Sequence, residues 1–107
     1  MKGIDFMKAE FFKALAHPTR VRIINLLFYD ERCVCELMNE LDLEQPNVSQ
    51  HLAILRKQDI VDTTKKGLQV FYRIADPHII TLMKLVEEII SDKLIINTSL
   101  TQKSNKT

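Results

Sequence analysis

The chain has little glycine, proline or cysteine and no tryptophan: 2 Gly, 3 Pro and 2 Cys occur among 107 residues. A β-sandwich needs many turns, which glycine and proline supply, so this scarcity argues against an all-β fold and favours a mainly helical one. Apolar residues make up 46% and charged residues 27% of the chain, which excludes a disordered chain and a coiled coil. The length allows one small core and therefore one domain.

Long hydrophobic runs are also missing. The chain contains no stretch of 18 uncharged apolar residues, and its first residues, Met1–Asp5, lack the apolar centre of a secretion signal. We therefore expect a cytoplasmic protein with no membrane partner. The two cysteines, Cys33 and Cys35, are too few and too close for a disulfide framework. In a reducing compartment such a pair is interpreted as metal ligands, as a catalytic pair or as part of the core.

Neither sign of charge dominates. The formal net charge is +1, and the segment 44–75 is only mildly basic, at +2. Proteins that rely on non-specific attraction to phosphates are usually far more basic. Composition alone is therefore only a weak indication of nucleic acid binding.

Apolar periodicity, in contrast, is clear and predicts five helices. Apolar residues recur at spacings of three and four on both sides of His17-Pro18, and again after Cys33. Pro18 and Pro46 each fit the first turn of a helix, so they predict the starts of the second and fourth helices. Between the fourth and fifth helices, residues 62–74 predict a β-hairpin, because β-branched and aromatic residues flank a basic, glycine-containing tip.

The last helix, predicted over about 77–96, is too apolar for one interface. Apolar residues such as Leu82, Val86 and Ile89 cover well over half of its circumference, whereas a helix that packs only on its own domain needs a stripe of about 100°. The surplus predicts a homodimer through the terminal helices. We expect one domain over residues 1–96 and a flexible, polar tail over residues 97–107.

The third helix has an unusual predicted start. The segment Cys33–Glu36 has the spacing of a capping box, with a thiol in place of the usual Ser or Thr hydroxyl. Side chains two residues apart diverge in a regular helix, but Cys33 at a non-helical N-cap position can turn its sulfur toward Cys35. The two sulfurs are therefore predicted to be able to meet at this helix start.

The order of the predicted elements is that of a winged helix-turn-helix, and the sequence resembles the ArsR/SmtB family of metal- and redox-responsive bacterial repressors over about residues 6–92. The resemblance rests on four segments in order: Leu15–Ile23, Cys33–Leu37, Gln45–Leu52 and the hairpin. It implies a mainly α fold with a small β-hairpin, and a dimeric repressor of double-stranded operator DNA that needs no cofactor.

The fourth helix carries side chains suited to the major groove of DNA. Short amide, hydroxyl and imidazole groups lie in its first turns, where the backbone N–H groups also favour a phosphate. The hairpin adds cations for phosphates or the minor groove. Alternatively, the polar face of the fourth helix only contacts solvent. The alternative role of the hairpin lysines is to protect an edge strand from pairing with another strand. The predicted DNA contacts are Asn47, Ser49, Gln50, His51, Arg56, Lys65, Lys66 and Arg73.

The resemblance to arsenic-responsive members implies that Cys33 and Cys35 are metal ligands. In such members a Cys-Val-Cys element holds As(III) or Sb(III) through two or three thiolates, and Met38 stands here where a third Cys can occur. Operator release on binding of arsenite or antimonite is the favoured hypothesis. Cu(I), Cd(II), Pb(II) and thiol oxidation at the same cysteines are the alternatives. Oxidation ranks lower, because a Cys-x-Cys disulfide closes a small, strained ring.

Two other functions are weighed from the remaining residues. Asp76-Pro77-His78 matches half of the zinc site of zinc-responsive members, but Ile89 stands where a second His is expected, so Asp76 is predicted to be a helix cap. An enzyme with a cysteine nucleophile and His17 or His51 as base lacks a third orienting group, so we predict no enzyme. His17 is interpreted as a helix-entry residue. A protein-interaction module that does not bind DNA is the last alternative.

Overall fold

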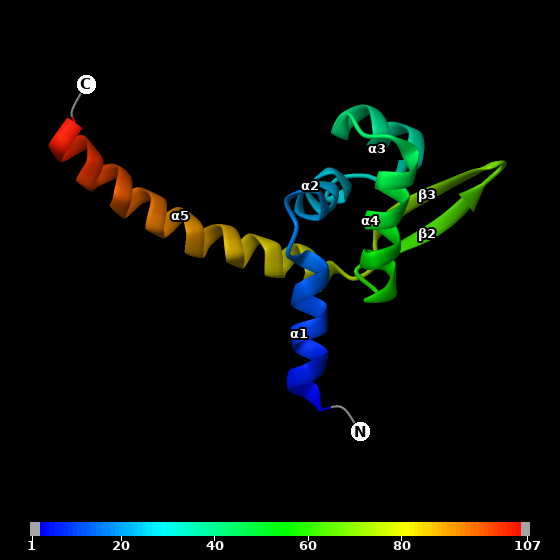
Figure 1. Ribbon diagram of the computed structural model, residues 1–107, viewed down its shortest axis with the longest axis horizontal. Coiled ribbons are helices and arrows are strands. Elements are labelled where there is room, and N and C mark those ends of the chain that lie inside the picture. Colours follow the sequence, from blue (N-terminus) through cyan, green and yellow to red (C-terminus); the bar gives the residue numbers. More distant parts are fainter. Residues whose placement is uncertain (1–2, 106–107) are drawn as a thin grey trace. The chain divides into compact units, whose positions relative to one another are not determined.

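The computed structural model describes residues 3–105, and it describes side chains for residues 3–93. The chain divides into two compact units, Met1–Asp76 and Pro77–Thr107. Within the described residues, the first unit holds four helices and a three-stranded sheet and the second holds one helix (Figure 1). None of the helices in this part of the chain is both long and apolar enough to cross a membrane.

The bounds of the elements follow the sequence prediction closely. The helices of the first unit are α1 (Ile4–Leu15), α2 (Pro18–Leu27), α3 (Val34–Leu41) and α4 (Gln45–Lys57). Its strands are β1 (Arg32–Cys33), β2 (Val61–Lys66) and β3 (Gln69–Ile74), and the second unit is α5 (Pro77–Asn105). This is the predicted winged helix-turn-helix.

The helix starts lie where prolines and capping side chains place them. His17 is the N-cap of α2, and its Nδ1 accepts a hydrogen bond of 3.0 Å from the backbone N–H of Thr19. The helix-entry role predicted for His17 is therefore confirmed. Pro18 and Pro46 both lie in the first turn of their helices, where the missing N–H costs nothing.

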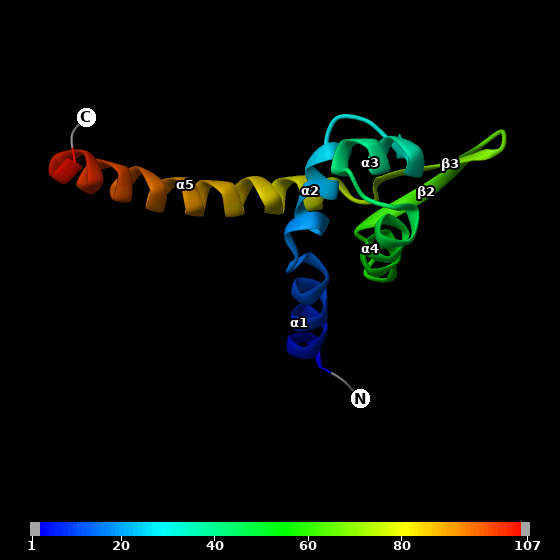
Figure 2. The same ribbon diagram turned by 45° about the horizontal axis from the view of Figure 1, so that its top comes forward.

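The sheet has the order β1-β3-β2, with both pairings antiparallel, and Figure 2 shows β2 beside β3. β2 and β3 form the predicted hairpin, in which Lys66 lies opposite Gln69. The two-residue turn between them begins with Gly67, whose φ of +62° lies in the left-handed region that favours glycine. β1 was not predicted, because a strand of two residues is too short to show an alternating pattern.

One apolar core joins α2, α3, α4 and the sheet of the first unit. Its fully buried side chains include Ile24, Leu37, Leu52 and Leu55, all at predicted core positions. Ile23, which the helical pattern did not single out, is also fully buried. The core fixes α3 and α4 against each other and α4 against β2, as a helix-turn-helix with an adjoining wing requires.

The helix α5 continues to Asn105, past the end near residue 96 that the apolar pattern predicts. No proline or glycine occurs in residues 97–107, so the sequence contains no strong helix breaker there. The predicted flexible tail over 97–107 thus overlaps a helical backbone, and its last two residues lie outside the described part of the chain. The domain bounds of 1–96 and 97–107 stay predictions.

Candidate DNA interface and thiol site

The first turns of α4 present a polar face. Asn47, Ser49 and Gln50 are exposed, whereas Val48 and Leu52 on the other side of the helix are fully buried. Arg56 is exposed one to two turns farther along. The structure therefore brings four predicted DNA contacts together on the accessible side of one helix, which is the arrangement that reading of a major groove requires.

His51 is the exception on this helix, because it is half-buried and bonded within the protein. Its Nδ1 lies 3.2 Å from Nη1 of Arg20, and its ring centroid lies 4.5 Å from that of His17. A guanidinium group only donates, so Nδ1 of His51 is the acceptor. Burial, followed by the nearby His17 and Arg20, lowers the pKa of His51 below its ordinary value of 6.5. A base contact by His51 stays a prediction, but its Nδ1 is already engaged.

The cations of the hairpin differ in their surroundings. Lys66 forms an ion pair with Glu31 and lies 5.3 Å from the centroid of the Phe71 ring. Arg73 Nη2 lies 3.2 Å from Asp62 Oδ2. Lys65 is exposed, and no ion pair joins it to any residue that the structure describes.

Asp62 is held in its charged form beside Arg73. The backbone N–H of Thr63, followed by the side chain of Arg73, lowers the pKa of Asp62. This carboxylate therefore offsets the Arg73 charge at neutral pH. Two of the three predicted wing cations, Lys66 and Arg73, thus have an acidic partner, and Lys65 is the cation most accessible to a phosphate.

The thiol pair lies at the start of α3, where the sequence predicts a capping box. Cys33 is the N-cap, its Sγ accepts a hydrogen bond of 3.3 Å from the Glu36 N–H, and its own N–H donates to Glu36 Oε1 at 3.0 Å. The predicted capping box, with a cysteine in the place of the usual Ser or Thr, is confirmed. Cys33 also belongs to β1, so the sheet and the helix start share this residue.

The two sulfurs meet as predicted, but as a disulfide between Cys33 and Cys35. The ranking of oxidation below metal ligation as the sensing chemistry stays a prediction. Extended φ and ψ of −78° and 166° at Cys33 leave the two Cα atoms 5.4 Å apart, within the usual range for disulfides. Metal ligation by this pair requires its reduced form, because thiolates are the ligands.

A cleft of about 460 Å³ adjoins the thiol pair. It extends between the start of α3, the exposed side of α4 and the strand β3. The residues that line it are Cys33, Val34, Cys35, Gln45, Ser49, Arg56, Gln69, Val70 and Tyr72. Sequence reasoning missed this cleft, because its walls come from segments far apart in the chain. It places the two cysteines beside predicted DNA contacts.

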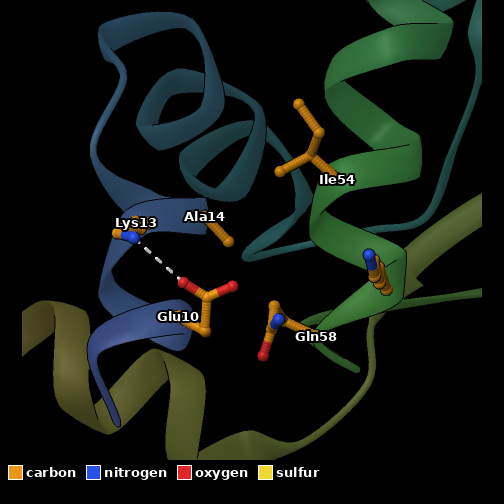
Figure 3. Close-up of a pocket in the computed structure, with 6 residues that line it drawn as sticks. Glu10, Lys13, Ala14, Ile54 and Gln58 are labelled. Carbon is orange, nitrogen blue, oxygen red and sulfur yellow. Dashed lines mark ion pairs between the residues drawn. The ribbon is translucent and has the colours of Figure 1, made fainter. Parts of the chain in front are cut away.

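A second cavity, of about 220 Å³, lies between α1 and α4 (Figure 3). Glu10 and Lys13, whose side chains pair at 3.1 Å, line it together with Ala14 and Ile54. It is lined by neither cysteine nor histidine, so it offers no ligand for a soft metal. Among the residues that the structure describes, no group of three or more His, Cys, Asp or Glu side chains is arranged to hold a metal ion.

Both the sequence and the structure of the chain are similar to those of known regulatory proteins. A family model described as "Bacterial regulatory protein, arsR family" matches residues 17–63, which include the thiol pair and α4. The HTH-type transcriptional regulator Rv0081 of Mycobacterium tuberculosis H37Rv is 40% identical over 95 residues, which cover 84% of this chain and 83% of that one. The crystal structure of M. tuberculosis Rv0081 matches 92% of this chain and 99% of its own with a TM-score of 0.85, at 36% identity.

Two further matches are proteins whose names state a function or an assembly. The arsenical resistance operon repressor of Escherichia coli K12 is 45% identical over 71 residues, which cover 65% of this chain and 60% of that one. The solution NMR structure of the homodimeric winged helix-turn-helix DNA-binding domain Mb0332 from Mycobacterium bovis has a TM-score of 0.79 at 26% identity. This match covers 86% of this chain and 92% of that one.

Proposed function

Because the chain belongs to the arsR family of bacterial regulatory proteins, we propose that it is a transcriptional repressor whose affinity for its operator depends on the state of Cys33 and Cys35. The chain is a transcription regulator and not an enzyme. In this proposal, α4 enters the major groove and the β2–β3 hairpin contacts the adjacent backbone. The protein releases the operator when the reduced thiol pair binds arsenite or antimonite.

The observation that carries the proposal is the place of the thiol pair. Cys33 caps α3, the first helix of the helix-turn-helix, and both cysteines line the same cleft as Ser49 and Arg56 of α4. Through Leu37, which is fully buried, α3 belongs to the same core as Val48 and Leu52 of α4. A change at the start of α3 therefore has a short, packed route to the DNA-reading helix.

Ligation of a trivalent ion changes that start directly. A Cys33 sulfur that binds an ion through two thiolates must reorient relative to the Glu36 N–H that it now caps. An inducer releases DNA to the extent that it binds the DNA-incompetent form more tightly, and usual couplings are about 1–3 kcal/mol. Met38 supplies only a weak thioether, so the open cleft leaves room for a third ligand from solvent or from a small thiol.

Thiol oxidation is the second candidate, and the disulfide between Cys33 and Cys35 favours it. Oxidation removes both thiolates and bonds the N-cap residue of α3 covalently to the first turn of that helix. It therefore acts on the start of α3, as a bound ion would. Cu(I), Cd(II) and Pb(II) are the remaining alternatives for the reduced pair.

The deciding experiment is a binding titration of reduced protein with DNA from upstream of its own gene. Arsenite, antimonite, Cu(I), Cd(II), Zn(II) and hydrogen peroxide are added in separate arms. Release by arsenite or antimonite supports the metalloid mechanism, release by peroxide alone supports oxidation, and release by Zn(II) alone contradicts both. Absence of DNA binding under every condition contradicts the repressor function.

Matched variants assign the response to the thiols. The double variant C33S/C35S should bind the operator as tightly as the native protein but resist release, since Ser also caps a helix. Met38→Ala is the control, because it removes a neighbouring sulfur and should retain induction. Release of the double variant by arsenite contradicts the thiol mechanism.

A further inference from the structure

Arg20 joins three segments of the first unit through one guanidinium group. Its Nε donates to the carbonyl oxygen of Ala14 at 2.6 Å, and its Nη2 donates to that of Lys13 at 3.3 Å, both at the end of α1. Its Nη1 donates to Nδ1 of His51 on α4 at 3.2 Å. The planar guanidinium group thus links α4, the proposed DNA-reading helix, to the end of α1. Hydrogen bonds fix the relative orientation of the two helices, which apolar contacts do less strictly.

His17 completes this arrangement from the start of α2. Its Nδ1 accepts from the Thr19 N–H, so this ring also carries a lone pair at Nδ1. The two imidazole rings lie 4.5 Å apart between centroids, at an interplanar angle of 49°. Both Nδ1 atoms therefore accept from donors that cannot become acceptors, and the contact with Arg20 requires a lone pair at Nδ1 of His51. We call Arg20, His17 and His51 the imidazole clamp.

No carboxylate is among the groups that act on His51 in the described part of the chain. The charged or titratable groups that face it are His17 and Arg20, from the start and body of α2. From α1 the network receives only carbonyl oxygens, and the Lys13 ammonium pairs with Glu10. On the other elements packed against α4, Glu36 of α3 bonds the Cys33 N–H and Asp62 of β2 pairs with Arg73. Glu40 of α3 is exposed and is not among the groups that act on His51.

We propose that Arg20 and His51 are positioning residues for DNA recognition, and that protonation of His51 opens the imidazole clamp and weakens operator binding in mildly acidic solution. The inference rests on the proposed function, in which α4 reads the operator. A protonated His51 carries hydrogens on both ring nitrogens, so Nδ1 no longer accepts from Arg20. It also places a second positive charge 3.2 Å from the guanidinium. The end of α1 and α4 then lose their directional link.

The direction of the pH effect follows from the same contacts. Burial, His17 and Arg20 lower the pKa of His51 in the folded protein below its ordinary 6.5, so the unfolded chain binds the proton more readily. The stabilisation from the clamp is complete above pH 6.5 and is lost as the pH falls through the lowered pKa. A proton that simply added positive charge to a DNA-binding face would instead tighten binding. A fall in affinity on acidification therefore separates the clamp from a phosphate contact by His51.

The test measures operator affinity by fluorescence anisotropy between pH 7.5 and 5.5, at constant ionic strength, with reduced protein and a chelator. We expect the native protein to lose at least about 5-fold in affinity, the lower end of usual couplings between sites. His51→Asn keeps an acceptor near the position of Nδ1 but does not titrate, so its affinity should not fall over this range. His78→Asn removes the remaining histidine of the chain and, as the matched control, should keep the native fall.

The state of His51 can also be measured without DNA, which tests the imidazole clamp independently of operator binding. The imidazole signals of His51, followed by NMR, should titrate below pH 6.5 in the native protein and closer to 6.5 in Arg20→Gln. The same variant should bind the operator more weakly at pH 7.5. Native operator affinity that is equal or higher at pH 5.5 overturns the clamp alone. Absence of DNA binding at every pH, with the NMR titration as expected, overturns the proposed function and the positioning role with it.

Discussion

Lys65 and Lys66 are neighbours at the end of β2, yet their side chains have different surroundings. Both are exposed, but Lys66 pairs with Glu31 and lies over the Phe71 ring, whereas no ion pair joins Lys65 to any residue that the structure describes. A cation that already has an acidic partner contributes less binding free energy when it contacts a phosphate. The acid must either give up the cation or stay close to the negatively charged DNA. The two lysines, which composition does not distinguish, should therefore differ in DNA binding.

We expect Lys65→Ala to weaken binding to operator and random DNA alike, and to reduce the slope of log affinity against log salt by about 1. Lys66→Ala should have a smaller effect on the slope, since the Glu31 carboxylate offsets its charge. Salt titrations of both variants on both DNAs check this. Equal slopes for the two variants would contradict the assignment.

Gln50 differs from both lysines, because it lies exposed on the first turns of α4 and carries no charge. Gln50→Ala should cost about 1–3 kcal/mol on the operator and little on random DNA, since an amide reads a base edge. The comparison of specific and random DNA is the internal control. A similar loss on both DNAs would show that Gln50 does not read bases.

At the scale of single elements, the capping box of α3 gives a direct test of what the Cys33 thiol does for the fold. In reduced protein, Cys33→Ala removes the acceptor for the Glu36 N–H and should lower the free energy of unfolding by about 1 kcal/mol. Cys33→Ser keeps an acceptor and should be at least as stable as the native protein. Urea denaturation of the two variants under reducing conditions measures the difference. Equal stability would mean that the thiol does not act as a cap.

The turn of the hairpin provides a second test at this scale. Gly67 has a φ of +62°, and no atom lies within 4 Å of where a Cβ would be built. The cost of Gly67→Ala is therefore conformational and should be about 1–2 kcal/mol of unfolding free energy. Leu68→Ala, at the fully exposed neighbour, is the control and should change stability by less than about 0.5 kcal/mol. The opposite order in denaturation experiments would contradict this turn geometry.

The elements that the sequence predicts are those with a local signal. Pro18 and Pro46 mark helix starts, the spacing from Cys33 to Glu36 marks a capping box, and the hairpin has a basic tip. The strand β1 has no such signal, because two residues show no period, and its pairing partner is far along the chain.

The parts of the site that the sequence does not predict depend on contacts between distant residues. Arg20 and His51 are 31 residues apart, so the polar pattern of α4 alone assigned His51 to the DNA face. Oxidation was ranked low because a Cys-x-Cys disulfide closes a small ring, whereas the extended backbone at Cys33 leaves the two Cα atoms 5.4 Å apart. The side-chain direction of a residue at a helix boundary is therefore predicted neither by the helical period nor by the alternation of a strand.

At the scale of the whole molecule, recognition of a two-fold operator requires two copies of α4 at a fixed separation. The helix α5 offers the surface for such an assembly, because Leu85, Ile89 and Ile90 are 50–63% exposed. A single helix with this much accessible apolar surface favours a partner, and we expect a second copy of the chain to cover this face in a closed two-fold dimer.

The dimer can be tested at Ile89, the most exposed of the three. Ile89→Glu places a charge in the predicted seam with Leu82 and Val86, so sedimentation at micromolar concentration should shift from dimer to monomer. Operator affinity should fall with it, because two linked reading helices bind far more tightly than one. Lys84→Glu, at an exposed polar position of the same helix, is the control and should remain dimeric. A native protein that sediments as a monomer would contradict the two-fold assembly, and an Ile89→Glu protein that stays dimeric would place the seam elsewhere.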